Sequence, residues 1–235
     1  MRVGRVLYVV GTPIGNLGDL SYRAVETLRE VELIAVEDTR HSAILLNHYG
    51  LHQTLVSFHE HNEARRTEEL LRELQSGRKV ALLTDAGMPS VSDPGYRLVA
   101  ACRRQAVPVT VLPGPSAVLT ALVGSGLPTH RFYFGGFLPV KSGQRQNELT
   151  AAAARAVTSI YFESPHRLLR SLQVLAELVP ARPVCVAREL TKRFEEFRTM
   201  TAPELAAHYG AHPPKGEITL VIAPEGRQPA GSEAP

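Results

Sequence analysis

The feature that most constrains the fold is a regular alternation, from Val6 to Gly124, of short apolar runs with amphipathic segments. This alternation is typical of a parallel sheet covered by helices on both faces. Strands are predicted at Val6–Val10, Leu33–Val36, Thr54–Phe58, Val80–Thr84 and Val107–Leu112, and helices at Ser21–Glu30, Ser42–His48, Glu63–Ser76, Tyr96–Arg104 and Ser116–Val123. We therefore expect an N-terminal α/β domain with a five-stranded parallel sheet over residues 1–128.

The pattern changes around Leu127–His130, where a second series of strands and helices begins. Short connections between neighbouring strands favour a mixed sheet there, so we expect a C-terminal mixed α/β domain over residues 129–224. Thr201 and Glu204 have the spacing of a capping box. Residues 225–235 hold too few apolar side chains to pack and are expected to form a disordered tail. The predicted strands are Arg131–Phe134, Ser159–Phe162, Val184–Ala187, Phe194–Met200 and Ile218–Ala223, and the helices are Gln144–Ala156, His166–Val179 and Pro203–Tyr209.

The composition is that of a globular chain that is free of disulfides. Hydrophobic residues make up 44% and charged residues 21% of the 235 residues. A net charge of +3 permits a nucleic-acid partner without requiring one. Cys102 and Cys185 both lie in segments that read as buried, which favours two packed thiols in a reducing cytosol over a disulfide.

Neither a membrane segment nor a metal site is expected. The apolar run Val6–Val10 is shorter than the core of a signal peptide, and prolines interrupt the uncharged stretch from Gln105 to Thr129. His59 and His61 place two imidazoles on one side of an extended segment, but no further Cys/His cluster joins them. We expect a cytoplasmic protein with no membrane partner and no metal.

Turns rich in Gly, Pro and small residues follow the predicted strands of the first domain. In a parallel sheet such turns gather at one edge. The turn Asp85–Gly95 lets a ligand lie against main-chain N–H groups, because Gly and Ala have little side chain to hold it away. Glycines at 11, 15 and 18 match neither the dinucleotide fingerprint nor the P-loop, which disfavours NAD and ATP. Ser116 suits an ordinary helix cap and a ligand contact equally well.

Six motifs stand in order along the chain: Gly11–Leu17, Glu37–His41, Asp85–Gly95, Pro113–Ala117, Gly136–Pro139 and Arg188–Lys192. Together they resemble the motifs of the tetrapyrrole-methylase-like (class III) S-adenosylmethionine methyltransferases. Within that family they are most similar to the members that methylate the ribose 2′-hydroxyl of a cytidine in small-subunit (16S) ribosomal RNA. The resemblance runs from about Leu7 to Ala223. Met88 departs from it, because a threonine is expected at that position.

The resemblance implies two α/β domains with S-adenosylmethionine in the cleft between them, usually in a homodimer. The implied substrate is small-subunit rRNA or the assembled 30S subunit. The implied cofactor contacts of the first domain are Pro13, Asp85, Ala86, Gly87, Met88, Ser116 and Ala117, and those of the second are Phe162, Leu190 and Gly216.

Methyl transfer to a ribose hydroxyl is an in-line displacement, so it depends on holding the oxygen and the methyl carbon in line. A positioned base adds on the order of 10² to 10⁴ in rate. Each charged candidate is equally often a solvated or salt-bridged surface residue. The candidates for the base are Asp38, Glu163, Glu189 and, with a depressed pKa, Lys192; those for holding phosphates are Arg40, Arg188, Lys192 and Arg193.

Two other functions stay open. A methyltransferase of tetrapyrroles, of the precorrin or uroporphyrinogen type, would share the fold and cofactor, but its first-domain turn normally reads Gly-Asp-Pro where this chain has Asp85-Ala86-Gly87. A non-catalytic RNA-binding module of ribosome assembly would not bind S-adenosylmethionine. Cofactor binding and nucleoside analysis of rRNA separate the three.

Overall fold

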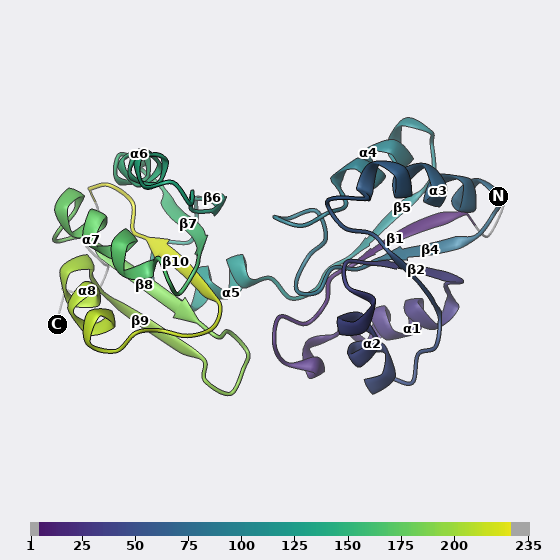
Figure 1. Ribbon diagram of the computed structural model, residues 1–235, viewed down its shortest axis with the longest axis horizontal. Helices are drawn as coiled ribbons and strands as arrows, with labels where there is room; N and C mark the ends of the chain where they lie inside the picture. Colours follow the sequence, from purple (N-terminus) through teal and green to yellow (C-terminus); the bar gives the residue numbers. More distant parts are fainter. Residues whose placement is uncertain (1–4, 227–235) are drawn as a thin grey trace. The chain divides into compact units, whose positions relative to one another are not determined.

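A computed structural model describes residues 5–226 of the chain. By its internal contacts the chain divides into two compact units, Met1–Ser116 and Ala117–Pro235 (Figure 1). Residues 227–235, most of the expected tail, lie outside the described residues.

The first unit is built on five strands that all run parallel, in the order β3-β2-β4-β1-β5. This confirms the parallel sheet predicted from the alternation. Strands β1 and β4 lie side by side in its centre, so the loops that follow them leave the sheet at the same edge. The strands are β1 (Val6–Val10), β2 (Leu33–Val36), β3 (Thr54–Ser57), β4 (Lys79–Leu82) and β5 (Val109–Leu112).

Helices cover both faces of this sheet, as Figure 1 shows. Leu70, Leu74 and Leu98 of α3 and α4 belong to the core on one face. Leu28 and Leu46 of α1 and α2 belong to the core on the other face. The elements are the 3-10 turn η1 (Leu17–Asp19) and the helices α1 (Tyr22–Glu30), α2 (Thr39–His48), α3 (Glu63–Gln75) and α4 (Tyr96–Arg104).

The second unit holds a mixed sheet in the order β6-β7-β10-β8-β9, which confirms the predicted class. Strands β6 and β7 are parallel, and the other neighbours are antiparallel. Strand β10, the last of the described strands, lies in the middle of the sheet and is buried along its whole length. The strands are β6 (Phe132–Phe137), β7 (Thr158–Glu163), β8 (Pro183–Arg188), β9 (Glu196–Thr201) and β10 (Ile218–Ile222).

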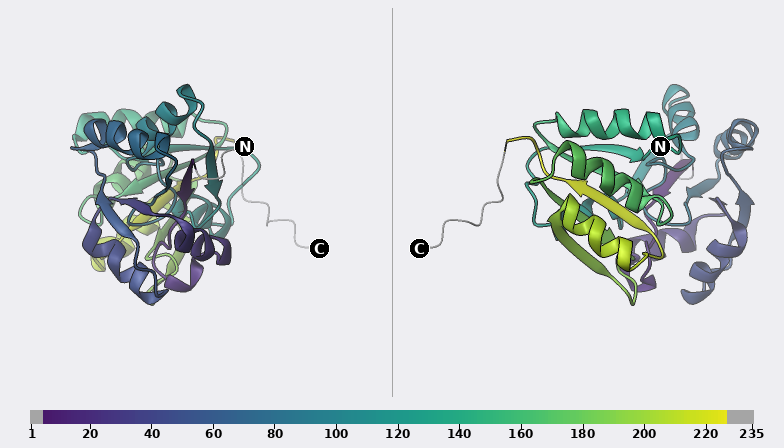
Figure 2. Two further views of the ribbon diagram at one scale, coloured as in Figure 1. Left: turned by 90° about the vertical axis from the view of Figure 1, so that its right-hand side faces the viewer. Right: turned by 60° about the vertical axis from the view of Figure 1, so that its left-hand side comes forward.

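Three helices, α6 (Ser142–Ala153), α7 (Leu168–Leu178) and α8 (Ala202–Ala211), lie in a row over this sheet (Figure 2, right). They share one apolar core with it. Helix α5 (Ala117–Gly124) contacts β10 and β7, and its Gly124 lies so close to the ring of Phe197 that a Cβ would not fit. The sequence placed the domain boundary after residue 128; by contacts α5 belongs to the second unit, and the division falls after Ser116.

The predicted strands and helices agree with the structure to within three residues at either end. Strand β6 runs beyond Phe134 to Phe137 because an irregularity at Gly135-Gly136 interrupts its pairing with β7 without ending it. The Thr201–Glu204 capping box is present, and both cysteines are buried and free. Among the described helices, none is long and apolar enough to cross a membrane.

Candidate active site

The loops that follow β1 and β4 are joined by main-chain hydrogen bonds at the carboxyl edge of the first sheet. The Thr12 N–H donates to the Gly87 carbonyl at 2.9 Å, and the Gly87 N–H donates to the Thr12 carbonyl at 3.1 Å. The Thr12 hydroxyl also donates to the Thr84 carbonyl at 3.1 Å. Two loops separated by about seventy residues therefore act as one structural piece.

The loop that follows β5 closes against the first of these. A Cβ on Gly11 would lie 2.8 Å from the Gly114 Cα, and a Cβ on Gly114 would lie 2.8 Å from the Gly11 carbonyl oxygen, so the two backbones touch. Gly87 is needed for a different reason. A Cβ there would meet nothing nearer than 3.6 Å, but its φ of +84° lies in the region that L side chains rarely adopt.

These three loops and the start of α5 carry the residues that the resemblance assigns to the cofactor contacts of the first domain. Pro13 is buried, Asp85 and Met88 are half-buried, and Ala86 is exposed. The Gly87 N–H is taken by Thr12 and is not available to a ligand. Ser116 and Ala117 are half-buried and lie on either side of the division between the two units.

The same edge gathers carboxylates. Burial, together with the negative charge of Asp85, raises the pKa of Glu37, while nearby His59 opposes the shift. Burial and the charges of Glu37 and Asp85 raise the pKa of Asp93 to about 7. Asp85 itself accepts a hydrogen bond from the Asp38 N–H at 3.3 Å. The loops after β2 and β4 thus give this edge an acidic character.

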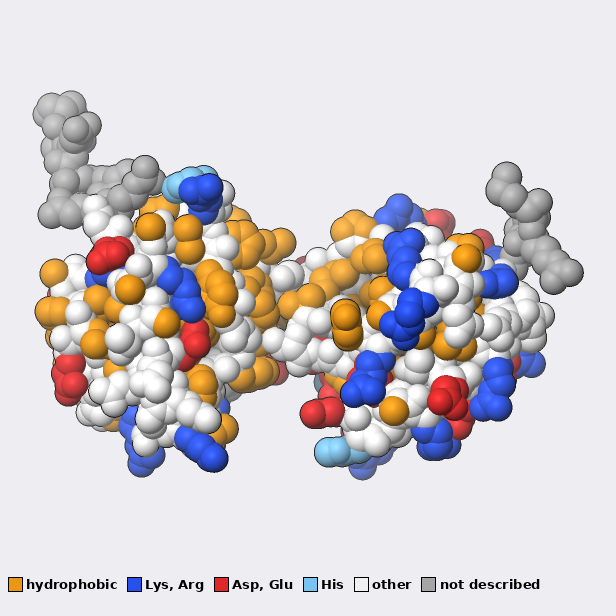
Figure 3. All heavy atoms as spheres, turned by 90° about the horizontal axis from the view of Figure 1, so that it is seen from above, with side chains coloured by type: hydrophobic (Ala, Val, Ile, Leu, Met, Phe, Trp, Pro, Cys, Tyr) orange, Lys and Arg blue, Asp and Glu red, His pale blue; other side chains and the backbone are white. Residues whose placement is uncertain are grey.

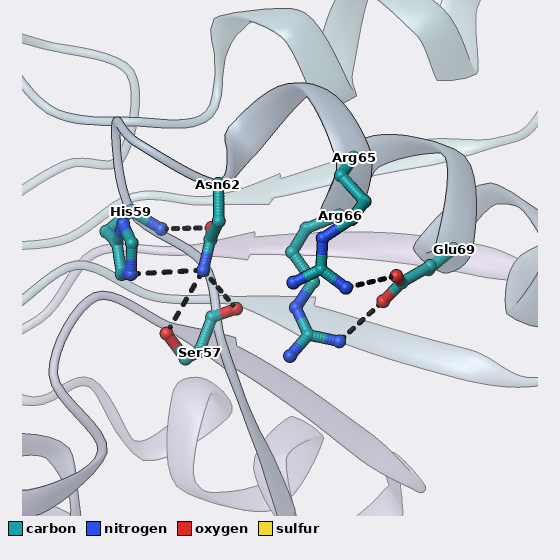
Figure 4. A network of polar contacts seen from close by, with 6 residues as sticks. All are labelled: Ser57, His59, Asn62, Arg65, Arg66 and Glu69. Carbon is teal, nitrogen blue, oxygen red and sulfur yellow. Dashed lines mark hydrogen bonds and ion pairs between the residues drawn. The ribbon is translucent and has the colours of Figure 1, made fainter.

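His59, in the loop after β3, is oriented by Asn62 (Figure 4). The Asn62 Oδ1 accepts from the His59 N–H at 2.9 Å, so its Nδ2 is the group that donates to the Ser57 carbonyl and faces the His59 Nε2 at 3.1 Å. In the neutral ring the proton is therefore on Nδ1, which is buried without a hydrogen-bond partner. Within residues 5–226 no group of three His, Cys, Asp or Glu side chains is placed to hold a metal ion.

Asp38 serves as the N-cap of α2. Its Oδ1 accepts from the Arg40 N–H at 2.8 Å, and its Oδ2 pairs with the Arg40 guanidinium at 3.1 Å. Hydrogen bonds from the side chain and backbone of Arg40 lower the pKa of Asp38 to about 2. This carboxylate and its arginine are thus paired with each other.

Glu163, at the end of β7, is enclosed inside the second unit. Its carboxylate accepts from the Ser171 hydroxyl at 2.5 Å, from the Ser164 N–H at 2.6 Å and from the Arg167 Nε at 3.2 Å. The side chain has no exposed surface. Three donors and full burial indicate a carboxylate that fastens α7 to the end of β7.

Glu189 and Lys192 form a cluster with Glu217 in the loops after β8 and before β10. The Lys192 Nζ lies 2.9 Å from a Glu189 oxygen and 3.0 Å from a Glu217 oxygen. Burial opposes the charge of Lys192, but the hydrogen bonds to these carboxylates prevail and raise its pKa. Gly216 has a φ of +85° and leaves no room for a Cβ beside the Glu189 carboxylate. Lys192 is therefore held as a cation between these two carboxylates.

The other candidates of the second unit lie around this cluster. Arg188 pairs with Glu196 at 3.1 Å, whereas the Arg193 guanidinium lies 5.5 Å above the Phe194 ring and has no carboxylate partner in the described part of the chain. Phe162 packs edge-on against two other phenylalanines of the sheet, and Leu190 is buried. In the view of Figure 3, Lys and Arg side chains are interspersed with acidic and apolar ones on both units.

Comparison with known proteins shows the family to which the chain belongs. A sequence model of the tetrapyrrole (corrin/porphyrin) methylases matches residues 6–206. The chain belongs to the tetrapyrrole methylase family. Curated relatives from Mesorhizobium japonicum and Escherichia coli O157:H7 are 50% and 48% identical over 93% and 92% of this chain, covering 75% and 77% of theirs. Both are named "Ribosomal RNA small subunit methyltransferase I".

Two solved structures have a similar fold. Uroporphyrin-III C-methyltransferase from Thermus thermophilus is similar with a TM-score of 0.63 and 25% identity, covering 93% of this chain and 94% of its own. Diphthine synthase is similar with a TM-score of 0.72 over 93% of this chain and 90% of its own, but at 16% identity this likeness concerns the fold alone.

The cofactor of this tetrapyrrole methylase is S-adenosylmethionine. The carboxyl edge of the first sheet fits that molecule chemically. Its sulfonium and ammonium groups carry positive charge, and the edge holds the carboxylates of Glu37, Asp85 and Asp93. The exposed small residue Ala86 leaves the backbone approachable, and half-buried Met88 offers apolar surface beside it.

Three residues of these clusters were not among the predicted site residues. Glu37 and Asp93 lie inside motifs that the sequence points to, but neither was distinguished from its neighbours. The pattern that could have singled them out is a carboxylate in a loop that follows a buried strand, because such loops meet at the carboxyl edge of the sheet. Glu217 precedes a strand and carries no such signal, because its partner Lys192 is distant in sequence.

Proposed function

We propose that this tetrapyrrole methylase transfers the methyl group of S-adenosylmethionine to the ribose 2′-hydroxyl of a cytidine in small-subunit (16S) rRNA. The observation that carries the proposal is the 48–50% identity, over more than nine-tenths of the chain, to relatives named for methylating small-subunit rRNA. The choice of ribose and of cytidine rests on the six motifs described above.

In this reaction the cofactor supplies an electrophilic methyl carbon. The residues of the chain hold the ribose oxygen in line with it, exclude water and accept the proton of the hydroxyl. Asp85, Ala86 and Met88 would hold the cofactor in the first unit, with Pro13, Gly87 and Ser116 shaping the loops around it. In the second unit we assign cofactor contacts to Phe162, Leu190 and Gly216, as the resemblance implies.

We further propose that the protein acts as a homodimer in the cytoplasm and that the assembled 30S subunit is its substrate. Among the four candidate cations, Arg193 is the one best suited to bind a phosphate, because in the described part of the chain it forms no ion pair with a carboxylate. Light scattering of the purified protein measures the oligomeric state directly.

The test uses 30S subunits and naked 16S rRNA from cells that lack this protein. Each is incubated with the purified protein and S-adenosylmethionine, digested to nucleosides and analysed by mass spectrometry. We expect 2′-O-methylcytidine to appear in the 30S sample. A methylated base in place of a methylated ribose would contradict the ribose assignment. Methylation of uroporphyrinogen with no product on RNA would favour the tetrapyrrole alternative.

Calorimetry with S-adenosylmethionine tests the remaining alternative. A non-catalytic RNA-binding module predicts no binding of the cofactor, whereas a methyltransferase predicts saturable binding with one site per chain. Binding of RNA without binding of the cofactor would therefore contradict the proposed reaction as a whole.

A further inference from the structure

The loop between β4 and α4 is fixed at both ends. Near its start Gly87 exchanges two hydrogen bonds with Thr12, as described above. At its end the Gly95 N–H donates to a Glu63 carboxylate oxygen of α3 at 3.0 Å. The loop is thereby held against two neighbouring elements, and the side chains that it carries are placed before any substrate arrives.

Its middle is held in an unusual conformation. Ser90 and Ser92 have φ values of +72° and +65°, although neither is a glycine. Backbone conformations of this kind cost energy and persist where the surroundings impose them, often at functional sites. Asp93 follows directly, in the stretch that these two serines bend.

The surroundings of Asp93 are acidic. Glu37 from the end of β2 and Asp85 from its own loop both act on its charge, and His59 from the loop after β3 acts on Glu37. In the described part of the chain no hydrogen bond or ion pair engages its carboxylate. Asp93 is thus a half-buried carboxylate that is left without a donor and stands among like charges.

The other candidate bases are each engaged. Asp38 caps a helix and pairs with an arginine, and Glu163 is enclosed by three donors. Glu189 accepts from Lys192 and from a backbone N–H, and burial is outweighed so that its pKa is lowered. Lys192 is held protonated. A group that must take up a proton needs free lone pairs, and these four offer few.

We propose that Asp93 is the general base of the methyl transfer, the group that accepts the proton of the ribose hydroxyl. The inference rests on the proposed function. As the ribose oxygen forms its bond to the methyl carbon, the carbon–sulfur bond breaks and its electron pair remains on sulfur. The hydroxyl proton passes to the Asp93 carboxylate and from there to water.

The electrostatics of the cluster suit this role. A base works best when its pKa lies near the pH of the reaction, and burial with the charges of Glu37 and Asp85 brings the pKa of Asp93 to about 7. An isolated aspartate, with a pKa of about 3.9, would be a weaker base. Burial and the acidic neighbours therefore make Asp93 a stronger proton acceptor than an isolated aspartate.

The first test needs neither substrate nor cofactor. In the protein labelled with ¹³C at aspartate side chains, we expect one carboxyl signal to titrate near pH 7 and to vanish in Asp93→Asn. In Glu37→Gln the same signal should titrate at lower pH, because one of the repelling charges is gone. A midpoint for Asp93 near 4 in the wild-type protein would overturn the inference.

The second test is single-turnover methylation of 30S subunits at saturating cofactor across pH 5.5–8.5. The wild-type rate should rise with pH as Asp93 loses its proton and then level off, with a midpoint below that of the cofactor-free protein because the bound cofactor is positively charged. Asp93→Asn should lose about 10²-fold or more of the plateau rate and show no such rise. Glu60→Gln, an exposed carboxylate in the loop after β3, is the matched control and should keep the wild-type profile.

Glu37→Gln separates the base from its neighbour. It should move the rising part of the profile to lower pH, and this shift tests the inference even where Asp93→Asn folds poorly. If Glu37→Gln abolishes the rate and Asp93→Asn retains it, the base is Glu37 and the inference is wrong. If the wild-type protein does not methylate rRNA, the proposed function itself is wrong. The wild-type measurement shows this independently of the variants.

Discussion

Glu163 and Asp93 are both carboxylates at the end of a strand or in the loop beyond one, yet their surroundings differ in a way that governs their chemistry. Glu163 accepts three hydrogen bonds from groups of its own unit. Asp93 accepts none in the described part of the chain and has two acidic neighbours. Donors stabilise a charge and hold it in place, whereas acidic neighbours make the same group ready to take up a proton.

Replacing Glu163 by Gln should destabilise the second unit without touching the chemistry. An amide presents an NH₂ group where one carboxylate oxygen now accepts a hydrogen bond, so we expect a loss of about 1–3 kcal/mol in the free energy of unfolding. Urea denaturation measures this loss, and the methylation rate per folded molecule should stay close to wild type. If the variant is as stable as wild type but loses its methylation rate, Glu163 is again a candidate for the general base.

Replacing Asp93 by Asn should stabilise the protein above neutral pH. The folded state holds the proton of Asp93 up to about pH 7, whereas the unfolded chain releases it near 3.8. Ionisation therefore costs the folded state stability as pH rises between these values, and the cost is complete above 7. Because the carboxylate is partly exposed and solvent screens its charge, we expect Asp93→Asn to gain about 1–2 kcal/mol in the free energy of unfolding.

Denaturation at two pH values checks this prediction. Asp93→Asn should be more stable than wild type at pH 8, and the difference should shrink towards pH 5. The exposed control Glu60→Gln should show no such trend. An equal difference at both pH values would mean that the substitution acts through packing and not through the charge.

Among the elements, the connection between β8 and β9 presents an exposed cation, Arg193, to solvent. Thr191, with a φ of +63°, donates its N–H to a Glu195 carboxylate oxygen at 2.6 Å, and Glu189 has a φ of +51°. This turn carries Arg193 and the exposed ring of Phe194 at its tip. A cation beside an exposed aromatic ring is a combination that binds single-stranded nucleic acid, through phosphate contact and base stacking.

Replacing Arg193 by Ala should weaken binding to 16S rRNA and reduce the slope of log affinity against log salt concentration by about 1. Its affinity for S-adenosylmethionine should not change. Filter binding at several salt concentrations measures the slope, with Arg170→Ala, an exposed arginine of α7, as the control. An unchanged slope would remove this turn from the RNA interface.

Elements of this chain are largely predictable from sequence because their signals are local. The strands of the first unit show as apolar runs, and the Thr201–Glu204 capping box shows in four residues. Strand β6 was predicted too short because the glycine pair that signals an end is here a local irregularity, tolerated where Gly135 lies against the Tyr161 ring.

The roles of the candidate carboxylates were less predictable, because they depend on partners far along the chain or in other elements. The residues around Glu163 do not predict its hydrogen bond from the Ser171 hydroxyl. Those around Glu189 do not predict its contact with Glu217. The raised pKa of Asp93 comes from burial and from the charges of Glu37 and Asp85, and the fold brings Glu37 close from another strand. Sequence therefore locates the motifs, while the ionic state of each side chain follows from tertiary contacts.

At the scale of the whole molecule, the position of α5 predicts where the chain can be divided. Because α5 contacts β10 and β7, a fragment 117–235 should be more stable than 129–235, which lacks the helix. Circular dichroism during thermal unfolding compares the two fragments. Equal melting temperatures would show that α5 contributes nothing to the second unit.

Strand β10 has a consequence for how the protein is made. Among the strands of residues 5–226 it is synthesised last, and it is the strand on which β7 and β8 pair. The first unit has all its strands once residue 112 has left the ribosome, so it can fold while translation continues. In the second unit β7 and β8 cannot be joined until β10 (Ile218–Ile222) has emerged, and in that interval a nascent chain is exposed to misfolding and benefits from a chaperone.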